Sequence, residues 1–172
     1  MTKFFLSILF TAILNFVYAQ EFPRSWEGKW SGELKIYDSK SVKPAMNLQM
    51  ELEIKPLTDS TWTWTIHYLT DKPDLRAYEL RKATKPNQWI IDEKNGIQLT
   101  QTVIGNRLSS SFSLDKTLLI TSYWLETDRM NFEIVVSNLD PASKTGLGNE
   151  ESPIVGNHPV SSYHRAVMQK VK

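Results

Sequence analysis

Aromatic side chains are the residues of this sequence best suited to bind another molecule. Six of them alternate with other residues along stretches typical of β-strands, on what we predict to be the inward faces. Ligand pockets are mostly hydrophobic with a few polar groups, so this set could line a pocket for an apolar or ring-containing molecule. The same residues could instead simply fill a closed interior. The six are Trp62, Trp64, Tyr68, Tyr78, Phe112 and Trp124.

Two arginines are candidates for the polar part of such a pocket. Arg76 shares a predicted strand face with Tyr78, and Arg165 shares one with Tyr163 and Val167. An inward guanidinium could pair with a ligand carboxylate, but either arginine could equally stack on an aromatic ring or point outward at an edge. We include Arg165 with the six aromatic residues as a predicted ligand-binding residue.

The histidines offer a weaker case for a metal or a haem. His67 falls on a predicted outer face, His158 in a long loop and His164 in the last predicted strand. His158 and His164 could meet at a metal or haem. Neither has a recognised metal-binding spacing, and the chain has no cysteine. We therefore predict solvated or structural histidines, no metal site and no cofactor.

The carboxylates and serines do not form a catalytic pattern. Asp92 and Glu93 are adjacent, so on a strand they point to opposite faces and cannot act together. The serine run 109–111 lacks a neighbouring histidine or a Gly-x-Ser-x-Gly turn. We predict no catalytic residue and a protein that is not an enzyme. An enzyme would be favoured only if the two later histidines converged with a carboxylate such as Asp128 or Glu126.

Short strands must position these residues. The stretch 46–55 shows five consecutive pairs of apolar and polar residues, and Lys94-Asn95-Gly96 is typical of a tight hairpin turn. Eight to ten strands at regular spacing predict one all-β domain, a single antiparallel up-and-down barrel. The predicted strands cover 26–37, 46–55, 61–68, 75–82, 89–93, 97–104, 108–114, 118–126, 130–136 and 160–171.

The first strand and one long loop stand out within this pattern. Gly28 would let the backbone turn tightly into the strand, and Trp30 would plug one end of the interior. Enclosing an indole of roughly 150 to 250 Å² contributes about 4 to 6 kcal/mol before costs. The segment 138–159 has three prolines and no periodicity, so we predict one long loop that could act as a lid.

The N-terminus has the layout of a secretory signal peptide. Lys3 precedes an apolar run over 4–17, and small residues near Ala19 suit cleavage there. The run is shorter than the roughly 20 residues of a membrane-spanning helix, so we expect cleavage and no stable membrane insertion. The predicted domains are a signal peptide at 1–19 and a barrel at 20–172. The mature protein would be exported, either periplasmic or extracellular.

The charge and length of the chain limit the kinds of partner that we expect it to bind. The 172 residues carry a formal net charge of +1, and a basic cluster occurs only in the short C-terminal tail. Nucleic-acid binding needs a concentrated basic patch, so we expect no nucleic-acid partner. About 150 residues are enough for one domain with a core, and we expect a monomer.

Gly28-x-Trp30 at the start of an exported, all-β chain resembles the calycin group, which comprises the lipocalins and their fatty-acid-binding and haem-binding barrel relatives. The architecture covers the whole mature chain, whereas the motif covers these two residues. The resemblance implies a lipocalin-like barrel, with Trp30 at the closed end near an arginine of a late strand, for which Arg165 is the candidate. The closer resemblance is to small exported barrel proteins of Bacteroidetes-type bacteria, which have no assigned function.

The barrel leads to the functional prediction. We expect an exported protein that holds a small, largely apolar molecule in its interior. The alternative is a non-enzymatic interaction module that recognises a protein or glycan through the exterior of the barrel. Its predicted face is a flat, weakly charged row of outward residues, Thr61, Thr63, Thr65 and His67.

Overall fold

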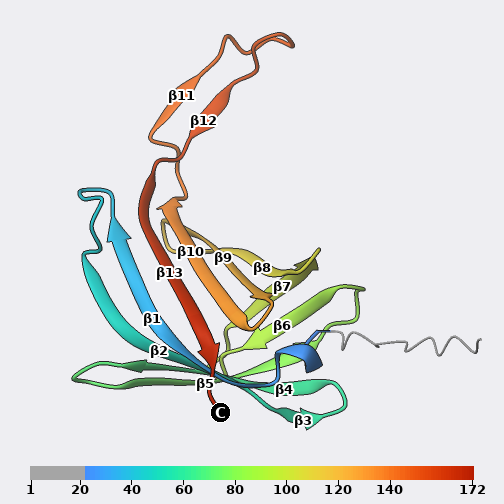
Figure 1. Ribbon diagram of the computed structural model, residues 1–172. Coiled ribbons are helices and arrows are strands. Elements are labelled where there is room, and N and C mark those ends of the chain that lie inside the picture. Colours follow the sequence, from blue (N-terminus) through green and yellow to red (C-terminus); the bar gives the residue numbers. More distant parts are fainter. Residues whose placement is uncertain (1–21) are drawn as a thin grey trace, which may run out of the picture.

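The computed structural model describes residues 22–172, which form an all-β structure with one short 3-10 helix, η1 (Arg24–Trp26) (Figure 1). The predicted signal peptide lies outside these residues. No helix in the described part of the chain is long and apolar enough to cross a membrane. The strands are β1 (Gly28–Asp38), β2 (Met46–Ile54), β3 (Pro56–Thr58), β4 (Thr61–Leu69), β5 (Asp74–Lys82), β6 (Gln88–Asp92), β7 (Gln98–Ile104), β8 (Arg107–Leu114), β9 (Thr117–Glu126), β10 (Arg129–Asn138), β11 (Ser143–Thr145), β12 (Val155–Asn157) and β13 (Val160–Lys170).

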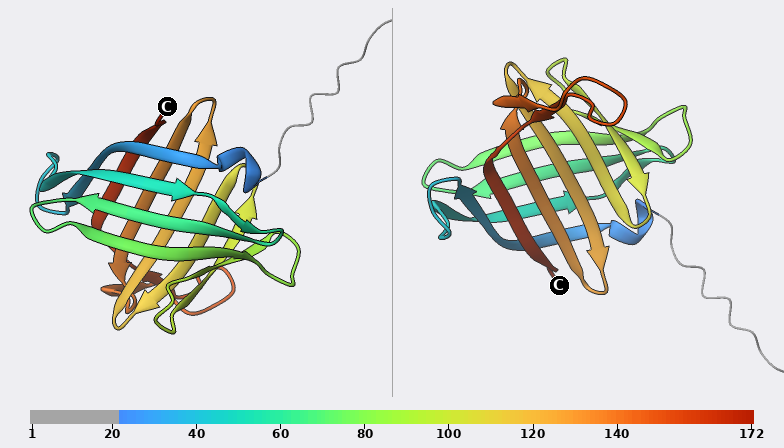
Figure 2. Two further views of the ribbon diagram at one scale, coloured as in Figure 1. Left: turned by 90° about the horizontal axis from the view of Figure 1, so that it is seen from below. Right: turned by 90° about the horizontal axis from the view of Figure 1, so that it is seen from above.

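Ten of these strands close into a barrel, and every neighbouring pair is antiparallel. Around the barrel the order is β1, β2, β4, β5, β6, β7, β8, β9, β10 and β13, and β13 returns to pair with β1. In projection, β1, β2, β4 and β5 cross the layer of β13, β10 and β9 at a steep angle (Figure 2). The prediction of a single antiparallel up-and-down barrel is confirmed. Closure leaves these ten strands no free edge, which removes a route to aggregation.

The alternation along β2 shows why this sequence forms a barrel wall. Met50, Leu52 and Ile54 have no exposed surface, whereas the residues between them, Glu51 and Glu53, face outward. Because successive side chains of a strand point to opposite faces, this pattern puts one row in the core and the other in water.

The plugged end of the barrel is built on Trp30, as predicted. Its side chain is 2% exposed, and its Nε1 donates a hydrogen bond of 2.9 Å to the carbonyl oxygen of Trp26 in η1. Gly28 has a φ of +130°, a conformation that favours glycine. The cation near the indole is not Arg165 but Lys170, whose Nζ lies 5.3 Å from the ring centroid. Lys170 pairs with Trp30 across β1 and β13, whereas Arg165 pairs with Lys35 further along the strands.

The segment 138–159 differs from the predicted irregular loop. It contains the hairpin β11–β12, which stands clear of the barrel as an arm (Figure 1). Hydrogen bonds within the arm hold its shape, such as Leu147 N to Ser152 O at 3.0 Å and Asn157 Nδ2 to Ser143 Oγ at 3.3 Å. The structure therefore does not show the arm closed over the barrel as a lid.

Candidate functional site

An aromatic floor divides the barrel interior. Trp64, Tyr123 and Phe132 are all buried, and the ring centroids of Trp64 and Tyr123 lie 5.0 Å apart in an edge-to-face arrangement. Tyr123 also packs on Phe132 with centroids 4.6 Å apart. Such aromatic pairs contribute about 0.5 to 1.5 kcal/mol beyond their buried area, so this floor is expected to be rigid. On one side of it lies the half of the barrel plugged by Trp30.

On the other side, the inward side chains become steadily more exposed toward the rim. Along β2 the inward row goes from a fully buried Met50 through a half-buried Leu48 to Met46, which is 56% exposed. Along β8 the same trend runs from Ser110 through Phe112 to Leu114, which is 62% exposed. The inward side chains therefore keep contact with solvent at this end of the barrel. We call it the open half.

The wall of the open half is mainly apolar. Its half-buried inward residues come from strands all around the barrel, and their inward direction follows from their register with buried neighbours. Several of them pack against the core cluster below. A wall of this composition is suited to contact with an apolar molecule. The residues are Ile36, Leu48, Tyr68, Tyr78, Phe112, Leu119, Thr121, Ile134 and His164.

A polar group interrupts this wall on β5. Arg76 shares the inward row with Asp74 and Tyr78, opposite Ile66 and Tyr68 of β4. Its Nε and Nη2 donate to Asp74 Oδ2 at 3.0 and 2.9 Å, and its guanidinium carbon lies 5.2 Å from the centroid of the Tyr68 ring. The side chains of Arg76 and Asp74 are 46% and 49% exposed, so solvent reaches this ion pair.

The tyrosines around this group stay protonated at neutral pH. Burial raises the pKa of Tyr68 and of Tyr78, and the nearby Arg76 only partly opposes the rise. Burial raises the pKa of Tyr123 further still. Burial lowers the pKa of Arg76, but the hydrogen bond that Arg76 donates to Asp74 and the neighbouring tyrosines outweigh this effect, so the net change is upward. Arg76 is therefore a permanent cation beside neutral hydroxyl groups that can donate hydrogen bonds.

His164 faces inward on β13, in the row of the buried Ala166 and Met168. The hydroxyl of Ser162 donates to the carbonyl oxygen of Tyr37 at 2.9 Å, so it can only accept from Nε2 of His164, also at 2.9 Å. This bond selects the neutral tautomer that carries its proton on Nε2. Burial lowers the pKa of His164 below its usual value near 6.5.

Acid is expected to destabilise the barrel partly through His164. Because the pKa is lower in the folded protein than in the unfolded chain, the unfolded chain binds this proton more readily. The contribution of neutral His164 to the free energy of unfolding is therefore complete above about pH 6.5 and is lost as the pH falls through and below that value. Urea unfolding between pH 7.5 and 5 should show a smaller decline in unfolding free energy for His164→Gln than for the wild type. Equal declines would contradict this account.

The structure corrects the predicted direction of Trp124. It lies on the outer face of β9, where the guanidinium of Arg107 stacks 4.0 Å from its ring centroid, and Tyr123 occupies the inward position. Both faces of β9 contain apolar residues, so the alternation did not show whether Tyr123 or Trp124 faces inward. The charge of Glu126 in the Trp124 row was the available signal, because the row of Tyr123 carries no charge.

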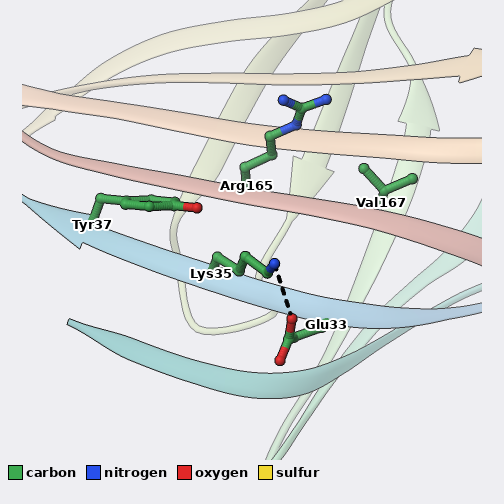
Figure 3. A pocket seen from close by; sticks show the side chains of 5 residues that line it. All are labelled: Glu33, Lys35, Tyr37, Arg165 and Val167. Carbon is green, nitrogen blue, oxygen red and sulfur yellow. Dashed lines mark ion pairs between the residues drawn. The ribbon is translucent and has the colours of Figure 1, made fainter. Parts of the chain in front are cut away.

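Arg165 points outward, which is the alternative that the sequence left open to an inward, ligand-binding direction. It is exposed on β13 and lines a surface hollow of about 340 Å³ with Glu33, Lys35, Tyr37 and Val167 (Figure 3). Lys35 forms an ion pair with Glu33 at 3.4 Å in this hollow. The inward row of β13 is instead formed by Ala166 and Met168, whose apolar alternation could have indicated the face.

The other predicted residues divide between the two halves. Trp62 belongs to the plugged half, where it packs on Trp89 with centroids 5.6 Å apart and donates from Nε1 to Glu27 Oε1 at 3.0 Å. Trp64 forms the floor, and Tyr68, Tyr78 and Phe112 line the open half. Their assignment as ligand-binding residues stays a prediction. Sequence reasoning missed Tyr123, Phe132 and Asp74.

His158 and His164 have different surroundings. His158 lies at the base of the arm, with Nδ1 2.9 Å from the carbonyl oxygen of Asn138, whereas His164 lines the barrel. Within residues 22–172 no group of three or more histidine or carboxylate side chains is arranged to hold a metal ion.

The outward row of β4 is less uniform than predicted. Thr61, Thr63, Thr65 and His67 are all half-buried. Glu51 of the neighbouring β2 lies 3.7 Å from His67 Nδ1 and pairs with Lys29 at 2.9 Å. This face therefore carries ionic groups beside its threonines.

Comparisons with known proteins support the fold. No protein-family model and no curated protein matches this chain. A protein of unknown function from the DUF3598 family of Nostoc punctiforme has a TM-score of 0.56 at 13% identity, over 86% of this chain and 48% of that one. Our chain thus spans about half the length of that relative. Rv2717c from M. tuberculosis has a TM-score of 0.54 at 17% identity, over 85% of this chain and 92% of that one.

A third similar structure, EF1p2_mFAP2b bound to DFHBI, has a TM-score of 0.38 at 9% identity, over 84% of this chain and 93% of that one. This similarity is too low to carry an argument about our chain. The first two matches agree with the barrel fold. Neither comes from a Bacteroidetes-type bacterium, so they do not support that closer resemblance.

Proposed function

We propose that this protein binds a small, largely apolar molecule in the open half of its barrel and is not an enzyme. The observation that carries the proposal is the graded exposure of the inward side chains above the floor of Trp64, Tyr123 and Phe132. Covering apolar surface that is in contact with water stabilises a complex by about 25 cal/mol per Å². The predicted signal peptide supports export, and we propose a monomeric binding protein.

Binding can be tested with an uncharged fluorescent probe, N-phenyl-1-naphthylamine, whose emission rises in apolar surroundings. We expect saturable binding by the wild type. Thr121→Trp should weaken binding at least about tenfold, because Thr121 faces into the open half and an indole there would take up space that the ligand needs. Ile120→Trp is the matched control, because Ile120 is 44% exposed on the outer face of the same strand.

Two results would contradict the proposal: no saturable binding of the probe, or equal binding by both variants and the wild type. Native mass spectrometry of protein purified from its host provides an independent measurement. It should show a bound small molecule that is absent after denaturation and refolding.

The second candidate function is recognition of a protein or glycan through the exterior. The hollow lined by Tyr37 and Arg165 favours it, because aromatic and guanidinium groups are common in recognition surfaces. If Arg165→Glu abolished binding to a partner that Thr121→Trp still bound, this function would be supported instead.

A further inference from the structure

The inward ion pair on β5 points to the chemistry of the ligand. Asp74 places its Oδ2 within 3.0 Å of both Nε and Nη2 of Arg76. The guanidinium therefore already contacts one carboxylate on the inward face, and the Arg76 side chain is 46% exposed. An arginine has five N–H donors in a planar fork, so one carboxylate oxygen leaves others available.

We propose that the ligand carries a carboxylate, which Arg76 binds with help from the hydroxyl groups of Tyr68 and Tyr78, and that Asp74 competes for the same guanidinium. This inference rests on the proposed function, because it places the apolar part of the ligand in the open half. The Arg76 guanidinium lies over the ring of Tyr68, which holds the cation against the wall. Tyr78 occupies the next inward position of β5, between Arg76 and the buried Leu80.

The competition by Asp74 makes the proposal specific. With the ion pair intact, the positive charge of Arg76 is largely compensated, and an incoming carboxylate must share or replace the Asp74 interaction. Removing the Asp74 charge would free the guanidinium and also remove a repulsion between two carboxylates. Removing the charge of Arg76 would have the opposite effect. The two substitutions of one ion pair are therefore expected to change ligand affinity in opposite directions.

The experiment compares decanoate with 1-decanol, which share an alkyl chain and differ in the charged group. Both compete with N-phenyl-1-naphthylamine for the wild type and three variants. Arg76→Gln should weaken decanoate binding at least about tenfold, because it removes a charged hydrogen-bond donor to the carboxylate, and should leave 1-decanol within about twofold. Asp74→Asn should strengthen decanoate binding several-fold. Arg165→Gln, which changes an outward arginine, should alter neither.

The outcomes separate the two proposals. If the wild type binds the probe, but Arg76→Gln and Asp74→Asn change decanoate affinity in the same direction or not at all, the carboxylate site is refuted and the apolar pocket stands. If the wild type binds neither the probe nor the two competitors, the proposed function fails, and the carboxylate site with it. Urea unfolding of each variant checks that the exposed substitutions leave the barrel folded.

Discussion

Replacing Trp30 with alanine is expected to lower the free energy of unfolding by about 3 to 5 kcal/mol. The indole is 2% exposed and fills the plugged end, so its loss leaves a cavity in a closed wall. The substitution also removes the donor to the Trp26 carbonyl oxygen and the ring beside Lys170. A domain of this size is stable by only about 5 to 15 kcal/mol, so the loss is a large fraction of the total.

Urea unfolding followed by far-UV circular dichroism measures this change. Trp124→Ala is the matched control, because it deletes the same side chain from the outer face, where Arg107 stacks on it. A cation–π contact at an exposed site contributes about 0.5 to 1 kcal/mol, so the control should lose about 1 kcal/mol. Similar losses at both positions would refute the assignment of Trp30 as the plug.

The second large effect is expected at the seam between β1 and β13. A Cβ added to Gly32 would lie 2.3 Å from the carbonyl oxygen of Val167 and 2.9 Å from the Cα of Met168. Both atoms belong to the backbone, so no side chain can move aside to relieve the contact. Overpacking commonly costs about 1 to 3 kcal/mol, and we expect Gly32→Ala to reach at least the upper part of that range.

The matched control for Gly32→Ala is Gly105→Ala, at the turn between β7 and β8. Gly105 has a φ of +60° with no atom within 4 Å of the added Cβ, so its cost is limited to about 1 to 2 kcal/mol of backbone strain. If Gly32→Ala disturbs the pairing of β1 with β13, this variant alone should show a lower urea midpoint and a larger slope of the native baseline. If Gly32→Ala and Gly105→Ala had the same free energy of unfolding, the close approach of β13 to Gly32 of β1 would not matter for stability, which would contradict this prediction.

These substitutions also connect stability to the proposed site. The floor residue Trp64 is held from below by the plugged half and from the side by Tyr123. Gly32→Ala would disturb the pairing of β1 with β13, and Trp30→Ala would leave a cavity in the plugged half. Either change would weaken the support of the wall that presents Arg76 and Phe112. A folded but loosened variant is therefore expected to bind the naphthylamine probe more weakly than the wild type.

Much of the barrel could be predicted from local patterns. The alternation over 46–55 corresponds to β2, and the Asn95-Gly96 turn joins β6 to β7 as expected. Burial of Trp30 could also be predicted, because it begins a row with Gly32 and Leu34. The pattern is strongest where one face is entirely apolar, since only one orientation of such a strand buries its side chains.

The candidate site was harder to predict where a strand carries apolar residues on both faces. On β9 either Tyr123 or Trp124 could have faced inward, and the register against β8 and β10 decided the matter. The hairpin β11–β12 was missed because each of its strands has three residues, too short for an alternation to be recognised. Asp74 and Arg76 are two residues apart, so alternation puts them on one face of β5, but the register with β4 decided that this face points inward.

Period-two alternation and the Gly-x-Trp opening were enough to determine that this chain is an antiparallel barrel with an indole at one end, because each strand must hide one face from water. Only the tertiary structure decided which end stays open, which arginine faces inward and what cation meets Trp30. Those features depend on the register between strands distant in the sequence, where a shift of one residue exchanges the inner and outer faces.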